Sequence, residues 1–184
     1  LLPIGAITRK REGKELADLE ELARAGVIGF SDDGNPVTNG QIFQMALLYA
    51  KDLNLPVIDH CEDLTLSLSA GINEGRASFR LGLHGYPNAA EESFIARDIA
   101  LAQNTGGHFH AAHVTTAGGV ELIRQAKSLG LPVSAEVTPH HLTMTEDWTA
   151  GIQTGNLMSQ PLNIGAYDPR AKVSPPLRTD ADRR

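Results

Sequence analysis

The sequence contains one cysteine, Cys61, so an intrachain disulfide is excluded. A chain of 184 residues without disulfides depends on a packed core, and its hydrophobic content of 41% is sufficient for one. No apolar run is long enough to cross a bilayer; the longest stretches, such as residues 45–50, are far too short. A single cysteine suits a reducing compartment, and we expect a cytoplasmic protein.

Positive charge is also scarce. Sixteen lysines and arginines face 22 aspartates and glutamates, which gives a formal net charge of −6. No local cluster of basic residues offsets this average. The balance argues against nucleic acid or an anionic membrane as partner.

Strand and helix patterns alternate along the chain and predict parallel βαβ units. The predicted strands are 4–8, 27–30, 56–59, 108–112 and 132–136, and the predicted helices are about 14–25, 41–53, 89–103 and 117–129. An open doubly wound sheet and a closed (β/α)8 barrel both fit this alternation. Because no glycine-rich nucleotide-binding motif follows any strand, we favour an α/β fold that is a partial (β/α)8 barrel of about five βα units.

The chain does not begin with a methionine. It begins at Leu1 and ends at Arg184, so we expect residues 1–184 to be the central portion of a single barrel domain, truncated at both ends. Residues 64–87 stay mostly unassigned, and residues 148–167 resemble an inserted surface loop.

Three ligand-type side chains follow successive predicted strands. Asp33, His60 and His113 each lie just after a strand end, and in parallel α/β folds these ends converge on one face. Two imidazoles and a carboxylate suit zinc. An aspartate in Asp-Asp-Gly is also a common turn former, and a lone histidine is often only a hydrogen-bonding residue. The spacing alone leaves both interpretations open.

Five sequence elements in fixed order extend the argument. They are GFSDDG at 29–34, VIDHCED at 57–63, HAAHVTT at 110–116, EVTPHHL at 136–142 and KVSPPLR at 172–178. Together they resemble the FSDDG, HCED, HxxHVST, EVxPHHL and KxNPPLR elements of class I bacterial dihydroorotases, in the amidohydrolase superfamily. The resemblance covers nearly the whole chain.

The resemblance implies a zinc-dependent, reversible interconversion of dihydroorotate and N-carbamoyl-L-aspartate, in de novo pyrimidine biosynthesis. Asp33 would bridge two Zn²⁺ ions, and His60 and His113 would bind the second of them. Asp32 is the neighbouring candidate for the bridge. Ser174 stands where the family has a substrate-contacting asparagine, and it can still donate and accept a hydrogen bond.

Other parts of the family's site are expected outside this chain. A His-x-His pair would lie upstream and a proton-shuttling aspartate downstream, so we expect no catalytic residue within the chain and an inactive fragment on its own. For the partners, the resemblance implies a small-molecule substrate and leaves open a homodimer or a complex with aspartate transcarbamoylase.

Three alternatives remain. Hydantoinase- and allantoinase-type enzymes bridge their metals with a carboxylated lysine, whereas the matching strand end here carries an acidic pair. A non-catalytic dihydroorotase-like subunit of an aspartate transcarbamoylase complex is the second, and a plain α/β scaffold is the third.

The remaining histidines and the cysteine are predicted to have other roles. Strand parity predicts that His108 and His110 face the helix layer and that Cys61 is buried and inert. His84 is expected at the surface. His140 and His141 follow the fifth predicted strand, and a role in supporting the site is open for them but is not favoured.

Overall fold

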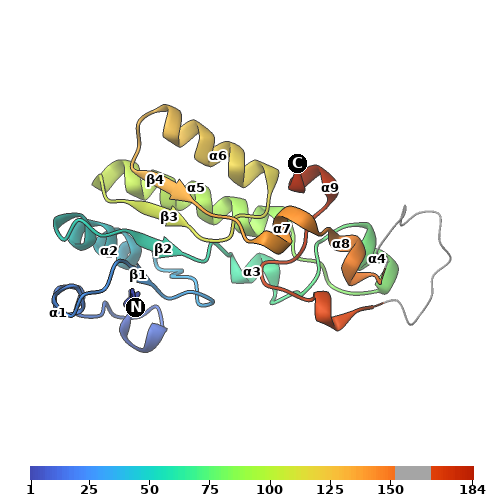
Figure 1. The fold of residues 1–184 in the computed structure, drawn as a ribbon, viewed down its shortest axis with the longest axis horizontal. Coiled ribbons are helices and arrows are strands. Elements are labelled where there is room, and N and C mark those ends of the chain that lie inside the picture. Colours follow the sequence, from blue (N-terminus) through green and yellow to red (C-terminus); the bar gives the residue numbers. More distant parts are fainter. Residues whose placement is uncertain (152–166) are drawn as a thin grey trace.

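A computed structural model describes residues 1–151 and 167–184 (Figure 1). The strands are β1 (Phe30–Ser31), β2 (Val57–Asp59), β3 (Phe109–Ala111) and β4 (Val133–Ala135). The longer helices are α2 (Gly40–Asp52), α5 (Asn88–Thr105) and α6 (Ala117–Ser128). The shorter ones are η1 (Arg9–Arg11), α1 (Leu19–Arg24), α3 (Leu64–Ser67), α4 (Arg76–Leu81), α7 (Pro139–Thr143), α8 (Glu146–Thr149), η2 (Pro169–Ala171) and α9 (Asp180–Arg183).

The four strands form one parallel sheet in the order β1-β2-β3-β4, which is also their order along the chain. Gly5 adds a single parallel bridge to Phe30, where the sequence predicts a first strand. A doubly wound sheet reverses its strand order at a switch point, whereas barrel strands follow one another in sequence order. The observed order confirms the expected barrel segment.

The core lies on one face of this sheet. Phe30, Val57, Phe109 and Val133 are all buried and pack with the apolar sides of α2, α5 and α6. Full burial of a side chain such as Phe109 stabilises the fold by roughly 1.5–3 kcal/mol. On the opposite face Ile58, His110 and Ser134 are only half-buried. One helix-covered face and one more open face are what a barrel segment requires.

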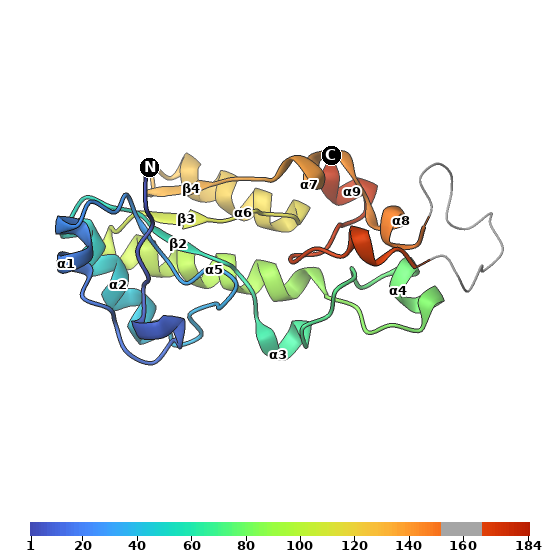
Figure 2. The same cartoon turned by 60° about the horizontal axis from the view of Figure 1, so that its bottom comes forward.

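Local signals fix the ends of these helices. Asn39 caps the start of α2, its side chain accepting from the backbone N–H groups of Gln41 and Ile42. The end of α5 is set by Gly106, which adopts the left-handed conformation at φ 70°. Figure 2 shows the long α5 running beside the sheet toward α3. Among the described residues, no helix is both long and apolar enough to span a membrane.

The expected elements need some corrections. The predicted helix 14–25 is shorter, because it begins only after the cap at Asp18, and Leu16 instead forms an antiparallel bridge to Thr8. The unassigned stretch 64–87 contains α3 and α4, and α7 and α8 follow β4. The predicted insertion at 148–167 lies largely outside the described residues.

Candidate metal centre

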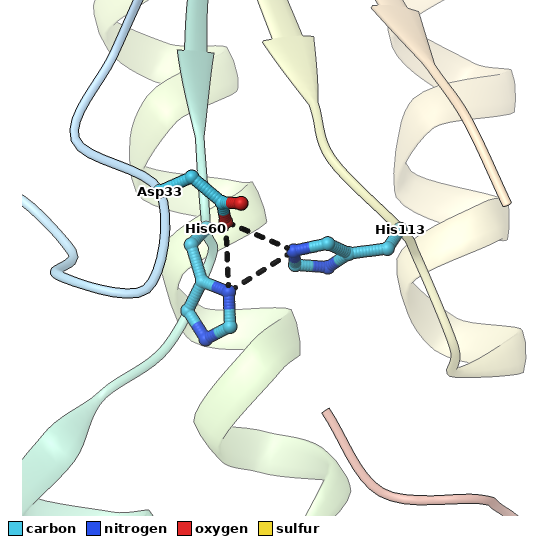
Figure 3. Close-up of side chains that lie close together, drawn as sticks. All are labelled: Asp33, His60 and His113. Carbon is cyan, nitrogen blue, oxygen red and sulfur yellow. Dashed lines mark hydrogen bonds and ion pairs between the residues drawn. The ribbon is translucent and has the colours of Figure 1, made fainter. Parts of the chain in front are cut away.

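Asp33, His60 and His113 come together at the carboxyl ends of β1, β2 and β3 (Figure 3). His60 Nδ1 lies 3.0 Å from His113 Nε2 and 3.4 Å from Asp33 Oδ1, and the last two atoms are 3.3 Å apart. A tetrahedral zinc ion with bonds of about 2.0–2.1 Å separates its ligand atoms by about 3.3–3.4 Å. The three donors therefore fit a divalent metal in both type and spacing.

The three side chains reach this point from different environments. His60 is 4% exposed, directly after β2, whereas the side chain of Asp33 is 64% exposed on the loop after β1. His113 has a positive φ of 35°, unusual for a residue other than glycine. Strained backbone of this kind is concentrated at functional sites.

The charges of the cluster shift its pKa values. Partial burial raises the pKa of Asp33, but the hydrogen bond and positive charge of His113, with His60, hold it below its ordinary value. Burial lowers the pKa of His60, yet Glu62 and the charge of Asp33 outweigh burial and raise it. Both shifts have the same physical cause, which is the attraction between the carboxylates and the imidazoles of the cluster.

The neighbouring Asp32 has a structural role. It is 1% exposed and accepts hydrogen bonds from the backbone N–H groups of Ile7 and Thr8, at 2.9 Å and 3.1 Å, and from the Thr8 hydroxyl. These bonds tie the loop after β1 to the chain next to Gly5. Of the acidic pair, only Asp33 faces the two histidines.

A second group of possible ligands does not suit a metal. Asp59, Cys61 and Asp98 lie close together and fully buried, but Arg97 already pairs with both carboxylates. Burial, together with the charge of Asp59, raises the pKa of the Cys61 thiol well above its ordinary value. The thiol therefore stays protonated, and the prediction that Cys61 is buried is confirmed.

A cavity of about 570 Å³ lies beside the three donors. Asp33, His60 and His113 line one part of it, and Lys172 and Ser174 line another. The C-terminal segment 172–178 thus brings Ser174 to the same cavity as the three donors.

Buried contacts hold this segment in place. Arg178 is 3% exposed and donates to Asn73 Oδ1 at 2.9 Å, to the Tyr86 carbonyl at 2.8 Å and to Thr115 Oγ1 at 3.0 Å. His141 Nε2 lies 3.0 Å from the carbonyl oxygen of Pro175. Arg178 and His141, to which the sequence assigned no such role, fix the backbone that follows Ser174.

The prediction for His108 and His110 is wrong. Both rings contact Ser134 Oγ, at 2.7 Å and 2.8 Å, and His110 lines a cavity together with Asp33 and His113. Strict alternation counted back from His113 would turn both rings toward the helices, but β3 ends at Ala111 and the positive φ of His113 breaks the alternation. His110 therefore lies on the open face of the sheet.

Sequence reasoning also gave no role to Glu62. Its Oε2 lies 2.8 Å from His60 Nε2, and its other oxygen accepts from Ser67 Oγ. Burial raises the pKa of Glu62, but these two hydrogen bonds outweigh burial and lower it below its ordinary value. The i, i+2 spacing in extended chain places His60 and Glu62 on the same side, a signal already present in the HCED element.

Solved structures resemble this fold. A D-hydantoinase from Bacillus sp. AR9 matches with a TM-score of 0.67 and 22% identity, over 92% of this chain and 37% of that chain. An L-hydantoinase (dihydropyrimidinase) from Arthrobacter aurescens matches with a TM-score of 0.68 and 21% identity, over 90% and 36%. At this identity the likeness supports the fold alone, a partial barrel.

Sequence relatives are closer. A dihydroorotase from Pelotomaculum thermopropionicum is 48% identical over 180 residues, and one from Syntrophobacter fumaroxidans is 47% identical over 182. They cover 98% and 99% of this chain, but the chain spans only 39% and 38% of their lengths. The sequence model of the family described as "Dihydro-orotase-like" matches residues 1–118. With its five sequence elements in the family's order and this match, the chain belongs to the dihydroorotase-like family.

Proposed function

We propose that the complete protein containing this chain is a zinc-dependent dihydroorotase, which interconverts dihydroorotate and N-carbamoyl-L-aspartate. The observation that carries the proposal is the triangle of Asp33 Oδ1, His60 Nδ1 and His113 Nε2, in a chain that belongs to the dihydroorotase-like family. Relatives that cover nearly the whole chain are named dihydroorotase, which supports the choice of substrate.

The proposed site holds two Zn²⁺ ions, with Asp33 as the shared ligand and His60 and His113 on the second ion. Bound zinc acidifies water and polarises an amide carbonyl, which are the two requirements for hydrolysis of a cyclic amide. Asp33 suits the shared position because a carboxylate has two oxygens that can each bind a metal. Its exposed side chain leaves the second oxygen accessible.

The chain's other contribution is the wall of the cavity. Ser174 lines it beside the three donors, and we propose that its hydroxyl contacts the substrate where relatives use an asparagine. The cavity is also lined by Lys172, whose positive charge suits an acidic substrate. No group within residues 1–151 or 167–184 is proposed to shuttle the proton; that aspartate is expected elsewhere in the complete protein.

Cellular context and domain organisation follow from the same proposal. We propose a cytoplasmic enzyme of pyrimidine biosynthesis in which residues 1–184 form the central portion of one barrel domain. Relatives more than twice as long, matched over nearly all of this chain, support a domain larger than these residues. A second copy or aspartate transcarbamoylase is the proposed protein partner.

A hydantoinase-type activity is the second candidate, because the similar solved structures are hydantoinases. The acidic pair at the end of β1, in place of the lysine expected for that group, favours dihydroorotase.

The proposal is tested by turnover with the complete protein, loaded with zinc, on dihydroorotate and on a 5-substituted hydantoin. We expect hydrolysis of dihydroorotate that is abolished by a chelator and restored by Zn²⁺. Turnover of the hydantoin alone would establish the second candidate. A folded, zinc-loaded protein that hydrolyses neither compound would indicate a non-catalytic subunit.

A further inference from the structure

The two ring nitrogens of His60 have different partners. Nδ1 points toward Asp33 and His113 (Figure 3). Nε2, on the far side of the ring, lies 2.8 Å from Glu62 Oε2. An ionised carboxylate can only accept a hydrogen bond. The shared hydrogen therefore belongs to His60 Nε2, which leaves the lone pair of a neutral ring on Nδ1, directed at the cluster.

Glu62 is itself held in place. Its Oε1 accepts from the hydroxyl of Ser67, at the end of α3, so each of its oxygens has a side-chain partner. His60 is 4% exposed and Glu62 is 5% exposed, so water does not compete freely for this contact. The histidine is thus fixed by a buried chain of two hydrogen bonds that starts outside the cluster.

We propose that Glu62 is a positioning residue for the metal centre: it fixes the tautomer and orientation of His60 so that Nδ1 binds the metal. The inference rests on the metal centre of the proposed function and is independent of the substrate. Carboxylates that accept from the second nitrogen of a metal-binding histidine raise its basicity, and their removal weakens metal binding by about 10- to 100-fold.

The test compares the zinc affinity of the complete protein with that of Glu62→Gln, by competition with a chromophoric chelator. We expect a loss of about 10- to 100-fold, since the amide keeps the size of the side chain but removes its charge. The absorption spectrum of the Co²⁺-loaded protein should also change, because it reports the geometry of the ligands. Glu146→Gln is the matched control, because Glu146 is 7% exposed and accepts one side-chain hydrogen bond, from Asn73. It should bind zinc as the parent does.

A purely structural role for Glu62 predicts a different result. Glu62→Gln would then lower the melting temperature of the metal-free protein and leave the zinc affinity and Co²⁺ spectrum unchanged, which would overturn the inference. If Glu62→Gln does not fold, Ser67→Ala takes its place; we expect a smaller loss of zinc affinity in the same direction, and no loss would overturn the inference. A parent protein that binds no zinc would overturn the proposed function as well. Zinc binding without turnover of dihydroorotate would overturn the proposed substrate and leave the inference about Glu62 standing.

Discussion

At the scale of single residues, the adjacent aspartates of the FSDDG element have separate tasks. Asp32 is buried and bonded to residues 7 and 8, and Asp33 faces the two histidines. Adjacent side chains in extended chain point to opposite sides, so the sequence indicates that only one of the two can face the cluster. It does not indicate which one, because that depends on contacts with residues 24 or 25 positions away. Only the family resemblance distinguishes Asp33 from Asp32 at the level of sequence.

The two aspartates should therefore differ when each is replaced by alanine. Asp32→Ala leaves the buried N–H groups of Ile7 and Thr8 without an acceptor, and we expect a loss of about 2–4 kcal/mol in the free energy of unfolding. Asp33→Ala should leave the stability of the metal-free protein nearly unchanged, because its side chain is exposed. It should weaken zinc binding by more than about 100-fold, beyond the loss typical of a hydrogen-bonded neighbour.

Urea unfolding of the metal-free variants and chelator competition measure the two effects separately. Equal zinc affinities for Asp33→Ala and the parent protein would be incompatible with Asp33 as a ligand. An Asp32→Ala variant as stable as the parent would show that its hydrogen bonds do not stabilise the loop.

At the scale of elements, β2 and α5 are joined by buried ionisable side chains. Asp59, the last residue of β2, and Asp98 of α5 both pair with Arg97, at 3.5 Å and 2.7 Å. Burial, and next the charge of Asp98, raise the pKa of Asp59 well above its ordinary value. Burial also raises the pKa of Asp98 to about 6, against the opposing effect of Arg97. Because Asp59 directly precedes His60, this contact helps to fix the strand end that carries the histidine.

The raised pKa of Asp98 predicts a pH-dependent stability. A carboxyl group that binds its proton more tightly in the folded state makes the folded state more stable when it is protonated. This contribution is complete below the unfolded pKa of 3.8 and is lost as pH rises through the folded pKa of about 6. Asp98→Asn mimics the protonated form at every pH. The melting temperature of the variant, relative to the parent, should therefore increase between pH 4 and pH 7, by roughly 5 °C.

Thermal unfolding of the metal-free proteins across this pH range measures the difference. Asp52→Asn, which removes an exposed carboxylate at the end of α2, serves as a control and should follow the parent at each pH. A constant offset between Asp98→Asn and the parent would indicate that Asp98 does not bind a proton in this range.

The longer helices could be predicted from sequence and the shorter ones could not. Helices α2, α5 and α6 begin within one residue of the prediction because apolar periodicity and caps such as Asn39 and Thr116 coincide there. Short helices such as α3 and α4 have too few turns for a period to be visible. They depend on contacts made elsewhere, such as those of Glu62 and Asn73.

At the scale of the whole molecule, the sheet is open. Among the described residues β4 pairs on one side only, and β1 has just the bridge to Gly5 on its outer side. Ile4, Ile28 and Val137, next to these edges, are 52%, 43% and 43% exposed. Unpaired strand edges beside exposed apolar side chains promote association.

Residues 1–184 expressed alone should therefore aggregate. Size-exclusion chromatography and thermal unfolding test this, with the complete protein as the control, which should be soluble. A monodisperse monomer of the isolated chain that unfolds cooperatively would contradict the prediction.

Anomalous diffraction at the zinc absorption edge, from crystals of the complete protein, tests the central claim most directly. We predict a peak about 2.0–2.2 Å from Asp33 Oδ1, His60 Nδ1 and His113 Nε2, with His60 Nε2 still hydrogen-bonded to Glu62. A zinc-loaded crystal with no peak between these three atoms, or with zinc bound through His60 Nε2, would contradict the account.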